Sequence, residues 1–102
     1  MTSNTDGRPA LSNELIEQFS LHGRTAVITG AAGGIGRQAA ITFTQAGANV
    51  VIADVGIAGL EETAEMVAAA GGRATVVPTD VSDRDQVNAL ADAAIKTHGR
   101  ID

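Results

Sequence analysis

The sequence predicts an α/β protein built around a doubly wound parallel sheet, and three observations support this. Short apolar runs rich in β-branched residues alternate with stretches that carry apolar residues at helical spacing. The first run, Thr25–Thr29, passes directly into a glycine cluster that opens a helix, and the second, Asn49–Ala53, ends at Asp54. Strand–helix units of this kind form parallel strands joined by right-handed crossovers.

The stretch Val27–Gly36, VITGAAGGIG, is the centre of this arrangement. Gly30, Gly34 and Gly36 stand as G-x-x-x-G-x-G, a variant of the dinucleotide fingerprint G-x-G-x-x-G. A strand, a glycine turn and a helix together set unpaired N–H groups and the positive end of the helix dipole against an anion. We expect Gly30 to turn the chain off the strand, Gly34 to let the backbone approach a pyrophosphate, and Gly36 to pack the helix closely on the sheet. The alternative is an ordinary strand–helix turn.

The chain before the first strand divides into two parts. Residues 1–9 are polar and are expected to form a disordered tail. Over Leu11–Phe19 the apolar residues fall at helical spacing, which predicts a short amphipathic helix that packs on the sheet edge or on a partner subunit. We therefore expect residues 1–20 to lie outside the domain formed by residues 21–102.

Two amphipathic helices flank the second strand. The first is expected to start at Ile35 and stop at Gly47, and the second is ended by Gly71 and Gly72. The expected inward residues of the first are Ile35, Ala39, Ala40, Phe43 and Ala46. Those of the second are Leu60, Ala64, Val67 and Ala68, with Glu61, Glu62 and Glu65 on a solvated outer face.

A third strand and a third helix complete the pattern. The strand is Ala74–Val77, and Pro78 interrupts it. Ser82 is the candidate N-cap of the helix, in a near capping box with Asp85, and Gly99 ends the helix. Its expected inward residues are Val87, Leu90, Ala91, Ala94 and Ile95. The sequence stops as a fourth strand begins beside the first, so the sheet is truncated after this helix and the first strand keeps an open edge.

Composition excludes several classes of protein. The 102 residues allow one domain, and a net charge of −5 argues against a nucleic-acid partner. The sequence has no cysteine, which excludes disulfides, thiolate metal sites and thiol nucleophiles. No apolar run is long enough for a membrane span, so we expect a cytoplasmic protein that does not contact membranes. His22 is expected in a solvated turn and His98 at a helix end, and neither is expected to bind a metal or to catalyse.

In this setting the motif T-G-x-x-x-G-I-G, from Thr29 to Gly36, resembles the short-chain dehydrogenase/reductase (SDR) family. The likeness covers about residues 19–102 and concerns the N-terminal, cofactor-binding half of such a protein. It implies a Rossmann-like domain that binds NAD(H), with adenine contacts from Asp80 and Val81. The implied cofactor-binding residues are Gly30, Ala32, Gly33, Gly34, Ile35, Gly36, Asp54, Val55, Asp80 and Val81.

Asp54 predicts NAD in preference to NADP. A carboxylate at the end of the second strand accepts hydrogen bonds from both adenosine ribose hydroxyls and repels a 2′-phosphate. No Arg or Lys stands at Gly33 or Val55, where NADP-preferring members of the resembled family tend to carry one. Arg37, the nearest base, either contacts a phosphate or faces solvent. Asp54 has an alternative role as a cap of the turn before Leu60.

Asp80 also has two candidate roles. One is the adenine contact, and the other is to begin the next helix. Because Ser82 is the better cap, we expect Asp80 to be free for a ligand.

The catalytic residues of the resembled family have no counterpart in this sequence. Its members use a tyrosine, a lysine one helical turn later, a serine and an asparagine. The sequence contains no tyrosine, and Lys96 is its only lysine. We therefore assign no catalytic residue and expect the 102-residue chain to be inactive by itself.

Three functions stay open at this point. The first is the NAD(H)-binding portion of an SDR oxidoreductase, in which the intact relative transfers hydride between NAD and a carbonyl or alcohol substrate. The second is a stand-alone, non-catalytic nucleotide-binding or interaction module. The third is a methyltransferase with an adenosyl cofactor, against which the T-G-x-x-x-G-I-G spacing and Asp80–Val81 argue. Self-association through the open sheet edge is a further expectation.

Overall fold

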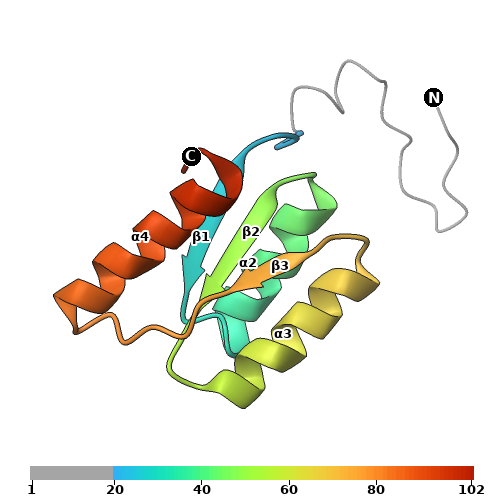
Figure 1. The fold of residues 1–102 in the computed structure, drawn as a ribbon. Helices are drawn as coiled ribbons and strands as arrows, with labels where there is room; N and C mark the ends of the chain where they lie inside the picture. Colours follow the sequence, from blue (N-terminus) through green and yellow to red (C-terminus); the bar gives the residue numbers. More distant parts are fainter. Residues whose placement is uncertain (1–19) are drawn as a thin grey trace, which may run out of the picture.

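A computed structural model describes residues 20–102 of the chain as a parallel sheet with helices on both faces (Figure 1). The elements in chain order are β1 (Thr25–Thr29), α2 (Gly34–Gln45), β2 (Asn49–Ala53), α3 (Ile57–Ala69), β3 (Ala74–Val76) and α4 (Arg84–His98). The strand order is β1-β2-β3. The expected tail over residues 1–9 and the expected helix over Leu11–Phe19 lie outside the described residues.

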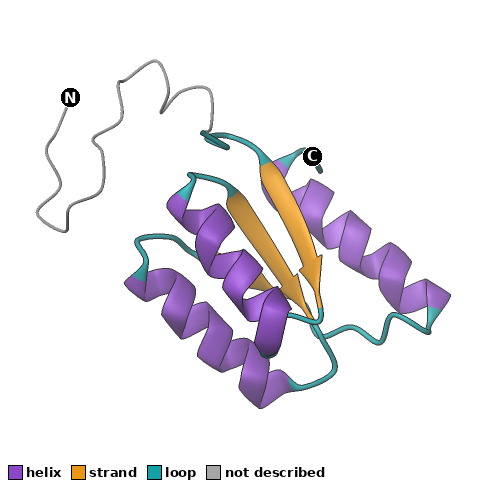
Figure 2. Cartoon of the chain, turned by 180° about the vertical axis from the view of Figure 1, so that it is seen from behind, coloured by secondary structure: helices purple, strands orange, loops and turns teal. Residues whose placement is uncertain are grey.

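The central strand β2 separates two hydrophobic cores. Its side chains alternate between the two faces of the sheet, as they do in any strand. Val50 and Ile52 pack in the core beneath α2 and α3, and Val51 and Ala53 pack in the core beneath α4. Figure 2 shows α2 and α3 together on one face and α4 on the other. This Rossmann-like layering confirms the predicted fold class.

The strand predictions are confirmed with one small correction. β1 and β2 have the predicted bounds, and they pair in parallel from Thr25 with Asn49 to Thr29 with Ala53. β3 is one residue shorter than expected, although the N–H of Val77 still donates to the carbonyl of Ile52 at 3.0 Å. All three strands therefore end at the same edge of the sheet.

The predicted N-cap of α4 is wrong. The cap is Asp83, whose side chain accepts hydrogen bonds from the N–H groups of Asp85 and Gln86. Ser82 instead donates both its N–H and its hydroxyl to the side chain of Asp80. Gly99 ends the helix as expected, with a φ of +80°.

The predicted inward faces of the helices are partly wrong. α2 buries Ala40 and Thr44, whereas Ile35 is 91% exposed and Phe43 lies at the surface. Ile35 is in the first turn of α2, beyond the strand ends, where no strand residue packs against it. α3 buries Leu60, Thr63 and Val67, and the expected Ala68 is exposed. α4 buries Leu90 and Ala94, and it exposes Val87, Ala91 and Ile95.

In the described part of the chain, β1 is an edge strand. Asp102 lies against its first residue: its N–H donates to the carbonyl of Thr25, and its carboxylate accepts from the N–H of Thr25, both at 2.9 Å. Arg24 and Arg100 pair with the same carboxylate. A groove of about 510 Å³ follows this edge, with Phe43 and Ile101 in its lining. Residues 100–102 form no strand, but Asp102 lies beside the start of β1, on the side where a fourth strand was expected.

We expect a polypeptide of these 102 residues to be marginally stable or to self-associate. The core within residues 20–102 contains only aliphatic side chains and no aromatic one. Ordering costs on the order of 1–2 kcal/mol per residue, and an open strand edge pairs readily with another chain. Sedimentation velocity across a concentration series, combined with thermal unfolding, measures both properties. A monomer that melts sharply above about 65 °C, beyond the usual mesophile range, would contradict the expectation.

Candidate cofactor site

The glycine loop between β1 and α2 has a backbone that only glycine adopts easily. Gly30 and Gly34 have φ angles of +66° and +56°, in the left-handed region. A Cβ on Gly36 would lie 2.3 Å from the carbonyl oxygen of Gly30. Gly30 therefore turns the chain off β1 as expected. Gly36 allows close packing against the loop backbone itself, whereas we had expected the close contact to be with the sheet.

The start of α2 presents N–H groups that have no partner among residues 20–102. The first hydrogen bond of the helix runs from the N–H of Arg37 to the carbonyl of Gly33, at 3.2 Å. The N–H groups of Gly34, Ile35 and Gly36 donate to no acceptor within residues 20–102. A Cβ built on Gly33 or Gly34 meets no atom within 4 Å, so the space beside the loop is open. Open N–H groups at the positive end of a helix dipole suit an anion.

Asp54 lies against this loop. One carboxylate oxygen accepts from the N–H of Ala32 at 3.0 Å, and the other accepts from the N–H of Val55 at 2.7 Å. The hydrogen bond from Ala32, followed by that from Val55, holds the pKa of Asp54 below its usual value, so the group is ionised at neutral pH. The N-cap of α3 is Gly56, which has no side-chain cap. Asp54 therefore links the second strand to the glycine loop and also caps the turn before Leu60 through Val55, although the N-cap of α3 is Gly56.

Asp80 lies at the same edge of the sheet, but it is not free. One of its carboxylate oxygens accepts from the hydroxyl of Ser82 at 2.6 Å and from the N–H of Ser82 at 2.9 Å. These bonds lower the pKa of Asp80, the hydroxyl contributing most. The backbone bond from Thr79 N–H to the carbonyl of Asp54, at 2.9 Å, brings this loop beside Asp54. The expectation that Ser82 would leave Asp80 unengaged is wrong, because Asp83 caps the helix.

The predicted solvent-facing role of Arg37 is wrong, because its guanidinium is turned into the protein. It donates to the carbonyls of Ala32 at 2.7 Å and Gly59 at 3.1 Å, and to the hydroxyl of Thr63 at 2.9 Å. It also pairs with exposed Glu62 at 3.2 Å. Thr63 is fully buried and had no place in the sequence prediction. The available signal was a hydroxyl at an inward position of α3, one turn after Gly59.

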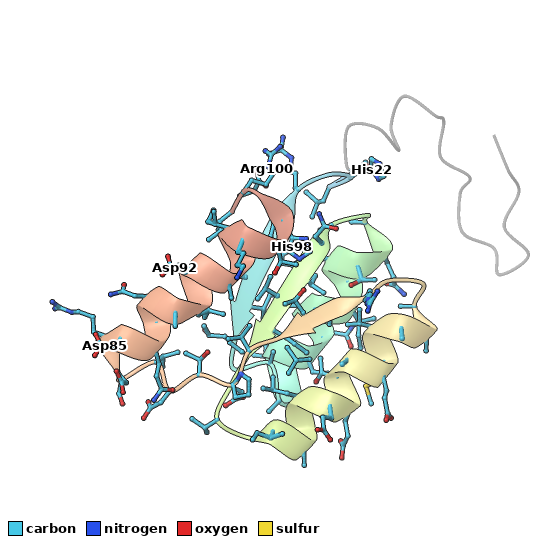
Figure 3. All side chains as sticks on the ribbon, in the orientation of Figure 1. His22, Asp85, Asp92, His98 and Arg100 are labelled. Carbon is cyan, nitrogen blue, oxygen red and sulfur yellow. The ribbon has the colours of Figure 1, made fainter. Side chains whose placement is uncertain are left out.

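The two histidines lie at the other end of the sheet. Figure 3 shows His22 and His98 near the ends where the strands begin, away from the strand arrowheads. His98 Nε2 is 3.2 Å from the hydroxyl of Thr75 on β3. A hollow of about 680 Å³ at this end is lined by His98, Asn49 and Arg73, among others. It is larger than the groove beside β1, but the open helix N-terminus and Asp54 are at the opposite end.

No group of three or more His, Cys, Asp or Glu side chains within residues 20–102 is placed to hold a metal ion. In the same part of the chain, no helix has both the length and the apolar character needed to cross a membrane.

A strand, a glycine loop and a helix at the carboxyl edge of a parallel sheet define a Rossmann-like domain. The family model described as short chain dehydrogenase matches residues 24–102. The chain therefore belongs to the short-chain dehydrogenase/reductase family, and the sequence-based resemblance is confirmed.

Relatives of known name agree with this assignment. The chain is 42% identical to "Short chain dehydrogenase/reductase astE" of Aspergillus oryzae, over 84% of this chain and 33% of the relative. It is 37% identical to the 7alpha-hydroxysteroid dehydrogenase of Escherichia coli K12, over 84% of this chain and 34% of the relative. The chain thus spans about a third of the length of the curated relatives it matches.

Solved structures show the same fold. A hydroxysteroid dehydrogenase from Escherichia coli superposes with a TM-score of 0.81 at 37% identity, covering 84% of this chain and 37% of that one. An SDR protein from Burkholderia phymatum, solved in complex with NAD, gives a TM-score of 0.77 at 43% identity, covering 81% of this chain and 30% of that one.

Proposed function

We propose that this chain binds NAD(H) at the glycine loop as the cofactor-binding portion of an SDR oxidoreductase. In the intact protein, hydride would pass between NAD and a carbonyl or alcohol substrate. The observation that carries the proposal is the open N-terminus of α2, which directs unpartnered N–H groups into the space beside ionised Asp54. The NAD complex of the Burkholderia phymatum relative supports it.

The pyrophosphate, the ribose and the adenine of the cofactor's adenosine diphosphate half each have a proposed binding site on the chain. The pyrophosphate would lie against Gly33–Gly36, where the helix dipole and the open N–H groups favour negative charge. The adenosine ribose would lie at Asp54 and Val55, and the adenine at Asp80 and Val81. The second oxygen of Asp80 accepts no hydrogen bond from residues 20–102 and can take one from the adenine amino group. The carboxylates thus bind hydrogen-bond donors, and the helix end binds the anion.

We propose that NAD is preferred over NADP. The pKa of Asp54 is lowered, so the carboxylate is charged at neutral pH and would repel a 2′-phosphate. Arg37, the nearest cation, is engaged with Ala32, Gly59 and Thr63 and is not free to neutralise that phosphate. Both observations favour a ribose that carries free hydroxyls.

Substitutions of Asp54 test this preference. Alanine removes both the charge and the acceptor for the N–H of Ala32, so NAD binding should weaken by about tenfold or more while discrimination against NADP is lost. Asparagine removes the charge but keeps one oxygen acceptor, so it should relax discrimination with a smaller loss of NAD affinity. Isothermal calorimetry with both cofactors measures these constants. Equal or tighter binding of NADP to the unmodified chain would contradict the preference.

A further inference from the structure

We propose that Arg37 and Thr63 are positioning residues that hold the glycine loop in its anion-binding conformation from behind. This inference rests on the proposed function, because it concerns how the cofactor loop is kept ready. Neither residue belongs to the set implied by the family motif, and neither side chain is directed into the open space beside the loop. Both act on backbone carbonyls of the loop.

The peptide unit between Ala31 and Ala32 is held on both sides. The buried hydroxyl of Thr63 donates to the carbonyl of Ala31 at 2.6 Å. The N–H of the same unit, on Ala32, donates to Asp54 at 3.0 Å. In a planar trans peptide the C=O and the N–H point in opposite directions, so two partners on opposite sides fix its rotation. Thr63 and Asp54 therefore clamp this unit between them.

The next peptide unit is held on one side only. Arg37 donates to the carbonyl of Ala32 at 2.7 Å. The N–H of this unit belongs to Gly33, and by the same trans geometry it points away from the guanidinium. Within residues 20–102 it makes no hydrogen bond of normal geometry, although the turn at Ala31–Ala32 brings it toward the carbonyl of Gly30. Fixing the carbonyl from behind thus presents the N–H of Gly33 for an external acceptor, next to the open N–H groups at the start of α2.

The geometry of the guanidinium matters more here than its charge. Its Nε donates to Thr63, and its Nη2 lies between the carbonyls of Ala32 and Gly59 and the carboxylate of Glu62. The hydroxyl of Thr63 thus accepts from Arg37 while it donates to Ala31. A lysine offers a single point charge without the planar fork and cannot make this set of bonds. We therefore expect Arg37→Lys to lose the hydrogen bonds that hold the loop and to bind NAD more weakly, although it keeps the charge.

Because α3 lies close to the loop, the position of the loop backbone is sensitive to substitutions on α3. A Cβ on Gly59 would lie 2.4 Å from the carbonyl oxygen of Ala32, so this glycine lets α3 approach close enough for Thr63 to reach the carbonyl of Ala31. A change on α3 is therefore transmitted directly to the loop backbone. Thr63→Val keeps the volume of the side chain and removes only the hydroxyl, which isolates the hydrogen bond.

The test uses five variants of the full 102-residue chain: Arg37→Met, Arg37→Lys, Thr63→Val, Thr63→Ser and Arg73→Met. Arg73→Met is the matched control, since it removes the same charge from the far end of the sheet, where Arg73 is exposed. Calorimetry gives the dissociation constant for NAD. Amide hydrogen exchange, followed by NMR without ligand, gives the protection of Ala32 relative to the β2 amides of Val51 and Ile52.

We expect Arg37→Met and Thr63→Val each to weaken NAD binding by about tenfold, and to raise the exchange rate of the Ala32 amide by about the same factor without changing that of β2. Arg37→Lys should lose at least about fivefold in affinity. Two variants should keep an NAD dissociation constant within about twofold of that of the unmodified chain. These are Thr63→Ser, which keeps the hydroxyl, and Arg73→Met. If Arg37→Met does not fold, as loss of β2 protection would show, Thr63→Val and Thr63→Ser carry the test.

Two results would overturn the inference. Full retention of affinity in Arg37→Lys, with loss in Arg37→Met, would mean that the charge of Arg37 and not its fork supports binding. Unchanged Ala32 exchange in the folded variants that lack the Arg37 fork or the Thr63 hydroxyl would mean that these side chains do not hold the loop. If the unmodified chain does not bind NAD, the proposed function fails, and the exchange of Ala32 still decides whether Arg37 and Thr63 hold the loop.

Discussion

Replacing Gly36 with alanine should abolish NAD binding and strongly destabilise the chain. The added Cβ would lie 2.3 Å from the carbonyl oxygen and 2.7 Å from the carbonyl carbon of Gly30, and 3.1 Å from the Cα of Ala31. All three atoms belong to the backbone, so none can rotate away as a flexible side chain would. The loop must move as a whole, which breaks the alignment of its N–H groups. Overpacking of this kind costs about 1–3 kcal/mol or more.

Gly33→Ala is the matched control for stability. Gly33 has an extended φ of 178°, which any residue adopts, and a Cβ there meets no atom within 4 Å. Urea unfolding should therefore show a change within about 0.5 kcal/mol for Gly33→Ala and a far larger loss for Gly36→Ala. A Gly36→Ala chain with unchanged unfolding free energy and unchanged NAD affinity would show that the close packing of α2 on the loop is not needed.

A polypeptide of these 102 residues should show no dehydrogenase activity, even with NAD bound. Reduction of a carbonyl by hydride leaves an alkoxide that needs a positioned proton donor, and such transfer contributes about 10²- to 10⁴-fold. The hydroxyls near the carboxyl ends of the strands are poor acids, and two of them are engaged. Thr79 donates to the carbonyl of Val77 at 2.9 Å, and Ser82 donates to Asp80 at 2.6 Å. The histidines lie at the opposite end of the sheet (Figure 3).

The assay follows the absorbance of reduced cofactor with NAD and a panel of secondary alcohols. The expected rate of NAD reduction equals the rate measured in buffer without the chain. Gly34→Val is the control for specificity, because a β-branched residue at a φ of +56° is strained and should disable the loop. Turnover above the buffer rate that disappears in Gly34→Val would show that residues of this chain supply the missing proton donor.

The strands and the place of the glycine loop could be predicted because their causes are local. The β-branched runs of β1 and β2 bounded these strands correctly, and the glycines and Asp54 marked the carboxyl edge of the sheet. The helix faces could be predicted only in part. Periodicity identifies an apolar stripe, but which side of the stripe is covered depends on the strands beneath it. α4 shows this limit, since it buries Leu90 and Ala94 but exposes Val87 and Ile95.

The supports of the loop could not be predicted because they join residues that are distant in sequence. The contacts of Arg37 with Thr63 and Gly59 depend on how closely α3 approaches the loop. The cap of α4 failed for a different reason. The sequence analysis preferred Ser82, but Asp83 next to it caps the helix, and Asp and Ser have about equal N-cap preference.

Binding of NAD at the glycine loop can be tested residue by residue by titrating the ¹⁵N-labelled chain with NAD and following the amide chemical shifts. We expect the largest shifts at Gly33–Gly36 and Val55, with smaller ones at Val81, and a loss of all of them in Gly36→Ala. The amides of Asn49, Arg73 and His98, at the other end of the sheet, should stay unchanged. Shifts confined to those three residues, or none at saturating NAD, would contradict binding at the glycine loop.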